Sequence, residues 1–151
     1  MGDLVKPQNT IVVVGTPLHV EKKITTVATM YPGRLVRKDA SDGAIKISGA
    51  ADSCTLGWLG YEQCHPNHQP ATVDTIYAVN AFAPVLYGGG FVIVARLANG
   101  QNITMGRPVE SAADGEVTEH GLNDDVRQVG IALESVNASG GAADIMVLSL
   151  I

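Results

Sequence analysis

Gly106–Glu134, GRPVESAADGEVTEHGLNDDVRQVGIALE, is the stretch of sequence that decides the fold. It predicts two short strands joined by an Asp-Gly turn, then a polar loop and a third strand that begins at a glycine. A looser copy lies at Gly33–Glu62, GRLVRKDASDGAIKISGAADSCTLGWLGYE. Glycines recur between the copies at offsets of 73, 72 and 73 residues, with Gly33, Gly43 and Gly57 opposite Gly106, Gly115 and Gly130. The sequence therefore predicts an internal duplication.

The rest of the chain has the pattern of an all-β protein. Alternating and β-branched runs recur between Gly-, Pro- and Asn-containing turns, and no stretch shows the periodicity of an amphipathic helix. We expect a compact β-barrel or sandwich with little or no helix. A flexible arm, residues 1–9, would precede a single domain, residues 10–151. This domain would contain related units at residues 10–62 and 91–151, separated by an insertion at residues 63–90.

Local patterns add expectations for the insertion and for the ends of the two copies. Val73–Val79 alternates and is predicted to be a strand. Ala81–Gly90 contains Pro84 and three consecutive glycines, and is predicted to be a loop. The apolar runs at residues 91–97 and 144–150 are expected to be the terminal strands of the first and second copy.

Composition excludes several classes of protein. Of 151 residues, 46% are apolar and only 17% are charged, which is typical of a globular chain with a core. The net charge of −5 argues against a surface that binds nucleic acid. The longest apolar runs are too short to cross a bilayer, and the first residues lack the apolar region of a secretory signal. We expect no membrane partner and synthesis in the cytoplasm.

One group of residues has the character of metal ligands. Cysteine and histidine bind Zn²⁺, but the spacing here matches no standard ligand pattern because there is no Cys-x₂-Cys pair. Free thiols and loop histidines in ordinary hydrogen bonds are the alternative, and a Cys54–Cys64 disulfide is sterically possible but disfavoured in the cytoplasm. We predict no cofactor, and the candidates for a metal site are Cys54, Cys64, His65 and His68.

Catalytic motifs are missing from the sequence. There is no Gly-x-Ser-x-Gly elbow, and no nucleophile stands in a recognisable relation to a base. Gly88–Gly90 precedes a predicted strand, whereas a phosphate site of this kind needs the N-terminus of a helix. The sequence therefore predicts that the protein is not an enzyme.

A few residues are candidates for an interface with another protein. Trp58 is the only tryptophan, it lies between glycines near Tyr61, and it either packs in the core or anchors an interface. Arg34 and Arg37 lie at the start of the first copy and could meet an acidic partner.

The order of turns resembles that of the small capsid decoration (cement) proteins of tailed phages. The likeness rests on TIVVVGTPLHV…PGRLVRKDASDGAIKI, and mainly on VARLANGQNITMGRPVESAADGEVTE…VRQVGIALESVNASGGAADIMVLSLI. It implies a β-barrel or β-tulip-like domain that forms a homotrimer on the capsid exterior of the virion and binds the major capsid protein. The polar N-terminal segment suits addition of a strand to a neighbour's sheet. The expected contacts of the segment are Leu4, Val5, Ile11 and Val12.

The sequence leaves two other interpretations open. The Gly-x-Pro-Val…Asp-Gly-x-Val pattern also occurs in barrel-sandwich or β-clip carrier and ligand-binding modules, where Lys46 would be the modified lysine near a hairpin tip. A small metal-dependent β-barrel enzyme would use the Cys and His candidates named above.

Overall fold

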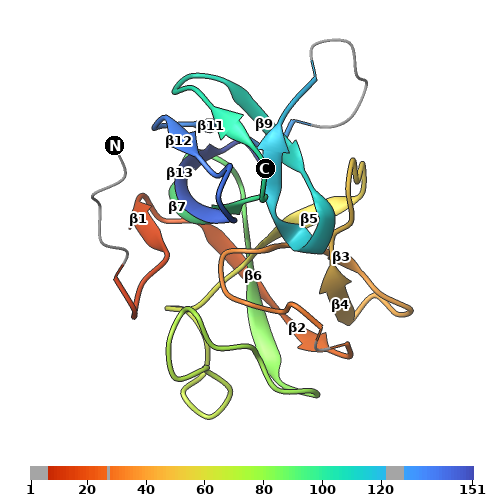
Figure 1. The fold of residues 1–151 in the computed structure, drawn as a ribbon. Coiled ribbons are helices and arrows are strands. Elements are labelled where there is room, and N and C mark those ends of the chain that lie inside the picture. Colours follow the sequence, from red (N-terminus) through yellow and green to blue (C-terminus); the bar gives the residue numbers. More distant parts are fainter. Residues whose placement is uncertain (1–6, 27, 122–127) are drawn as a thin grey trace.

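The computed structural model describes residues 7–26, 28–121 and 128–151 (Figure 1). The described residues contain thirteen strands and one short 3₁₀ turn, η1 (Ala113–Gly115), and no α-helix. The all-β prediction is confirmed.

Ten of the strands form two closed five-stranded barrels. The first, here called the N-barrel, has the order β2-β4-β3-β5-β6. Its strands are β2 (Leu18–Ile24), β3 (Leu35–Lys38), β4 (Ala44–Ile47), β5 (Thr55–Leu59) and β6 (Phe82–Tyr87). The second, the C-barrel, has the order β7-β10-β9-β11-β13 and closes through a β7–β13 pairing. Its strands are β7 (Val92–Leu97), β9 (Pro108–Ser111), β10 (Val117–Glu119), β11 (Gly130–Ala132) and β13 (Ala143–Ser149).

The remaining strands attach to the C-barrel region, in the upper part of Figure 1. β1 (Val12–Val14) pairs antiparallel with β7, so it extends the sheet of the C-barrel. β8 (Asn102–Ile103) and β12 (Val136–Asn137) form a two-stranded ribbon.

The two barrels have the same connectivity. β2 pairs parallel with β4, as β7 does with β10, and the other pairings within each ring are antiparallel. The registers agree as well, because Leu35↔Trp58 in the N-barrel corresponds to Pro108↔Ile131 in the C-barrel, 73 residues later. The bond from Gly33 N to Leu59 O recurs from Gly106 N to Ala132 O, each at 2.8 Å. The internal duplication predicted from the glycine spacing is thus present in the strand pairing.

The predicted boundaries of the copies need one correction. The run at residues 91–97 is not the last strand of the first copy: it forms β7, the counterpart of β2, and begins the second. The last strand of the N-barrel is β6, which was predicted to be a loop. Pro84 is tolerated in this strand because proline lacks a backbone N–H donor but keeps its carbonyl acceptor. The Pro84 carbonyl accepts a hydrogen bond from Gly60 N at 2.7 Å.

The segment between β5 and β6 also differs from its prediction. Val73–Val79 forms turns and no strand. Val73 and Tyr77 donate single backbone bonds to Gln8 O and Met30 O, and both side chains are buried. Because β6 belongs to the N-barrel, the extra residues of the first copy end before Phe82. The division into an arm, residues 1–9, and one domain, residues 10–151, stays a prediction.

A row of apolar side chains on the outside of the N-barrel, called the outward row below, joins the two barrels. Leu35, Trp58 and Leu86 lie side by side on β3, β5 and β6, and all three are fully buried. They belong to the same core cluster as the interior of the C-barrel, whereas the N-barrel interior forms a separate cluster around Val36 and Leu59. Trp58 Nε1 donates a hydrogen bond of 2.9 Å to Ser149 Oγ at the end of β13.

Two of the repeated glycines are required by close backbone approach. A Cβ on Gly57 would lie 2.2 Å from Leu86 O, and one on Gly130 would lie 2.7 Å from Leu148 O, the corresponding leucine. We expect Gly57→Ala and Gly130→Ala each to lower the free energy of unfolding by about 2 kcal/mol or more, since a carbonyl cannot move aside as a side chain can. Urea denaturation measures this. Gly43→Ala is the matched control, because a Cβ there meets nothing within 4 Å; equal losses in all three variants would contradict the steric argument.

Trp58 gives a second test of the fold. Replacing a large buried aromatic side chain by alanine typically costs about 3–5 kcal/mol. We expect Trp58→Ala to lose that much stability in urea denaturation. Ser149→Ala should lose less, about 1–3 kcal/mol, because it leaves the buried Trp58 Nε1 without its acceptor and removes the bonds of Ser149 Oγ with Ile151. A Trp58→Ala variant as stable as the wild type would show that the row does not hold the barrels together.

Candidate functional site

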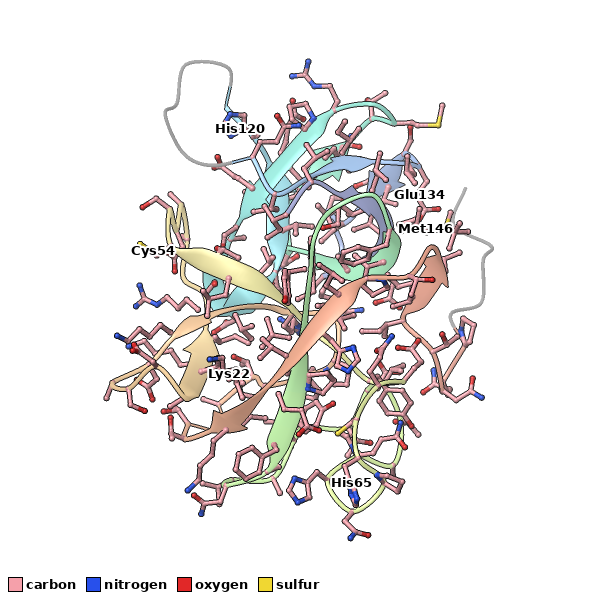
Figure 2. The ribbon with its side chains drawn as sticks, turned by 180° about the vertical axis from the view of Figure 1, so that it is seen from behind. Lys22, Cys54, His65, His120, Glu134 and Met146 are labelled. Carbon is pink, nitrogen blue, oxygen red and sulfur yellow. The ribbon has the colours of Figure 1, made fainter. Side chains whose placement is uncertain are left out.

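The four candidate metal ligands do not form one cluster. The described residues contain no group of three or more His, Cys, Asp or Glu side chains placed to hold a metal ion. Cys54 is exposed next to β5, and Figure 2 shows it far from His65, at the left edge of the view, whereas His65 lies near the bottom. Both histidines hold the loop between β5 and β6: His65 Nδ1 accepts from Asn67 N at 3.2 Å, and His68 Nδ1 accepts from Phe82 N at 2.7 Å.

Cys64 is a buried thiol. Its Sγ lies 3.6 Å from Phe82 O, which accepts its hydrogen bond, and burial raises the pKa of the thiol. The two cysteines are both free. Among the described residues, His65, His68 and Cys64 therefore make hydrogen bonds within the loop between β5 and β6 and at the start of β6, and Cys54 lies apart from them. The disulfide that the sequence left open is not formed.

The structure describes only two of the four N-terminal candidates for an interface. Leu4 and Val5 lie outside the described residues, so their role stays a prediction. Ile11 is fully buried and Val12 pairs with Ile93 of β7, so these two are used within the chain rather than on a neighbour's sheet. The carboxylate of Glu62 fixes this segment, since Oε1 accepts from Thr10 Oγ, Ile11 N and Val12 N.

The aromatic candidates lie in the core. Trp58 is fully buried between the barrels, and Tyr61 is 6% exposed with its hydroxyl donating to Ala71 O at 3.3 Å. Of the two alternatives left open by the sequence, the core describes both side chains within this chain, and neither is exposed to anchor another protein. The direction of Trp58 follows from the alternation of β5, which turns Leu59 into the N-barrel and Trp58 out of it, onto the C-barrel.

The two candidate arginines make contacts within the chain. Arg34 Nη1 lies 3.0 Å from Glu116 Oε1 and donates to Asp114 O, so it ties β3 to the turn of the C-barrel. Arg37 Nε lies 3.4 Å from Asp52 Oδ2, and its side chain is 41% exposed. Arg37 thus keeps surface that a partner could meet, whereas most of Arg34 is enclosed.

Lys46, the residue on which a carrier would depend, lies within β4. It pairs with Arg37 of β3, and its Nζ lies 3.5 Å from Asp39 Oδ1. A lysine in a strand and an ion pair is not presented at a hairpin tip. The geometry therefore does not favour a carrier.

Two exposed apolar surfaces were not found from the sequence. One is a groove of about 320 Å³ on the N-barrel, called the N-groove below. Its apolar wall comes from β2, β5 and β6, and its rim holds two lysines around an aspartate. The lining residues are Val20, Lys22, Lys38, Asp42, Leu56, Val85 and Tyr87. Lys38 Nζ lies 2.5 Å from Asp42 Oδ1, and its hydrogen bond and charge lower the pKa of that carboxyl.

The second surface lies on the loop between β5 and β6, drawn in yellow-green in the lower part of Figure 1. Ile76, Val79 and Phe82 are 38%, 55% and 43% exposed, and we call these three residues the loop patch. A hollow of about 350 Å³ runs beside Ile76 and Val79. The sequence predicts an insertion in this segment, but its alternation predicts a strand at Val73–Val79, in which every second side chain would be buried.

Comparison with known proteins identifies the class. The family described as XM1 gp53 minor capsid protein matches residues 1–150, and the chain belongs to this family. It is therefore a phage capsid-associated structural protein, as the resemblance in the sequence implied.

The fold agrees with this assignment. The head fiber gp8.5 N base of bacteriophage phi29 has a similar fold, with a TM-score of 0.54 at 11% identity over 89% of this chain and 94% of that one. No curated protein matches the chain. Both matches are to structural parts of phages, which favours a non-enzymatic role over the carrier and the metal enzyme. Among the described residues no helix is long and apolar enough to span a membrane.

The thiols test this description of the site. We expect Cys54 to react rapidly with a chromogenic disulfide reagent at pH 8, and Cys64 to react only after unfolding, because burial disfavours its thiolate. Titration should count one thiol in the native protein and two in urea. Cys54→Ser is the control and should leave no fast thiol. Two fast thiols, or none in urea, would contradict the structure.

Proposed function

We propose that this protein is a decoration (cement) protein, which binds the outer surface of the phage capsid and stabilises contacts between major capsid subunits. Membership of a minor capsid family supports the location in the virion. The observation that carries the finer proposal is the loop patch, an exposed apolar surface where the two barrels differ.

The composition of this loop suits a protein interface. Within residues 63–81 Asp74 is the only formally charged residue of the sequence. The buried centres of interfaces are depleted in charged residues, and clustered exposed apolar side chains mark interaction sites. A surface kept for solubility alone would carry more charge.

The loop is also held firmly to the N-barrel. His68 stacks on Phe82 with ring centroids 5.7 Å apart. Tyr77 Oη donates to Gly60 O at 2.6 Å, and Gln69 Nε2 donates to Tyr61 O at 2.8 Å. A patch fixed before binding loses little conformational entropy on docking, which favours affinity.

The proposal includes the assembly expected from the resemblance. The partner is the major capsid protein, the protein acts as a homotrimer on the capsid exterior, and it is made in the host cytoplasm before it binds. Direct contact with packaged DNA is not part of the proposal, since a net charge of −5 repels phosphates.

Co-sedimentation with capsids that lack this protein tests the proposal. We expect the wild-type chain to sediment with assembled capsids but not with unassembled major capsid subunits. Val79→Asp should weaken binding about tenfold or more, because a carboxylate would be desolvated in the contact. Its thermal stability should not change, since Val79 is 55% exposed.

Val14→Asp is the matched control, because Val14 is 64% exposed on β1, next to the predicted N-terminal contact. It should bind capsids like the wild type. If Val14→Asp alone lost capsid binding, the capsid contact would lie on the N-terminal segment and not on the loop patch. Failure of the wild-type chain to bind any assembled capsid would refute the decoration role.

A further inference from the structure

The N-groove is exposed in one copy of the repeat and filled in the other. Leu56 of the lining is 44% exposed, and Leu18, which pairs with the lining residue Tyr87, is 60% exposed. Their C-barrel counterparts, Val129 and Phe91, are 0% and 1% exposed. Four other lining residues on the strands, Val20, Lys22, Lys38 and Tyr87, also have buried counterparts 62 or 73 residues later. These counterparts are Ile93, Ala95, Ser111 and Ser149, whereas Val85 is itself buried, as is its counterpart Val147.

The N-barrel of the same chain covers this surface of the C-barrel. Ser149, the counterpart of Tyr87, accepts the hydrogen bond from Trp58. Ser111, the counterpart of Lys38, donates from Oγ to Gly49 O at 2.6 Å. The surface of the C-barrel that corresponds to the N-groove is therefore the binding surface for the outward row of the N-barrel.

The outward row has a counterpart too. Pro108, Ile131 and Leu148 lie side by side on β9, β11 and β13, in the register that Leu35, Trp58 and Leu86 have in the N-barrel. The N-barrel row is fully buried, but these three residues stay partly exposed. Leu133, which follows β11 two residues after Ile131, is 36% exposed and extends the apolar area. We call Pro108, Ile131 and Leu148 the C-row.

Each chain thus has one uncovered surface of each kind, and the two kinds already bind each other within the chain. We propose that the N-groove of one copy receives the C-row of a second copy, so that the contact between the barrels of one chain is repeated between chains.

The charges of the two barrels favour this pairing. Residues 10–90 carry six Lys or Arg and six Asp or Glu, a net charge of zero, whereas residues 91–151 carry three Arg and eight Asp or Glu, a net charge of −5. The rim of the N-groove presents Lys22 and Lys38 around Asp42, an excess of one positive charge. A C-barrel from another copy therefore brings negative charge toward a lysine-bearing groove, which speeds association and orients it.

The contact joins two different surfaces, so it is heterologous. Such contacts close into a ring when the rotation between copies allows it, and otherwise continue as a filament. A ring of three is the closed form that agrees with the homotrimer, and in this respect the inference rests on the proposed function. The lining of the N-groove contains none of the three loop-patch residues, so one copy could bind its neighbour and the capsid together.

Cross-linking of two single-cysteine variants tests the contact without any capsid. In a Cys54→Ser background, where Cys64 stays buried, one tagged chain carries Leu56→Cys and an untagged chain carries Ile131→Cys. We expect a short bis-maleimide to join the chains only in the mixture, because neither variant places two new cysteines at one contact. A chain carrying both substitutions should form covalent species that stop at three copies.

Several outcomes would overturn the inference. Cross-linking of either variant with itself would indicate a symmetric contact, and a chain that stays monomeric at about 1 mM without mixed cross-links would show that the surfaces do not bind. In light scattering, Leu56→Asp should weaken self-association at least tenfold, while Val79→Asp, in the loop patch, should not. Capsid binding is measured separately, so capsid binding without mixed cross-links would reject this contact and leave the decoration role standing.

Discussion

The packing of Trp58 against the C-barrel is the contact on which the rest of the structure depends. It buries the outward row of the N-barrel and fixes the distance between the barrels, because its Nε1 must reach Ser149 Oγ. That distance leaves no room for a side chain at Gly33 or Gly115, where a Cβ would lie 2.6 Å from Val94 O and Leu35 O. Two of the repeated glycines that first indicated the duplication are thus consequences of how closely the barrels approach.

The sequence was informative where a rule acts on neighbouring residues. The Gly57 and Gly130 spacing predicted the duplication because both positions meet a carbonyl of the next strand. It failed for β6, since Pro84 and the following glycines read locally as a loop, whereas pairing with β2 and β5 makes this segment a strand. The local sequence pattern of β6 does not show which distant strands will pair with it, and here those strands decide its structure.

The candidate site shows the same limit. Residue type singled out His68 as a metal ligand, but its ring nitrogen accepts the amide of Phe82 and is committed to the loop. Residue type also made Trp58 an interface candidate, and the structure turns it inward, onto the other half of the chain. The N-groove could not be predicted from the sequence, because Leu56 and its counterpart Val129 are both apolar and differ only in what covers them.

Each barrel is built from one uninterrupted segment of the chain, since β2 to β6 precede β7 to β13. On the ribosome the N-barrel can therefore close while the C-barrel is still being made. During that interval Leu35, Trp58 and Leu86 are exposed to water, and the nascent chain carries an apolar surface that is buried only when the C-barrel forms. The surface that joins the two barrels in the folded protein therefore favours aggregation while the chain is being made. The exposure ends when the C-barrel closes.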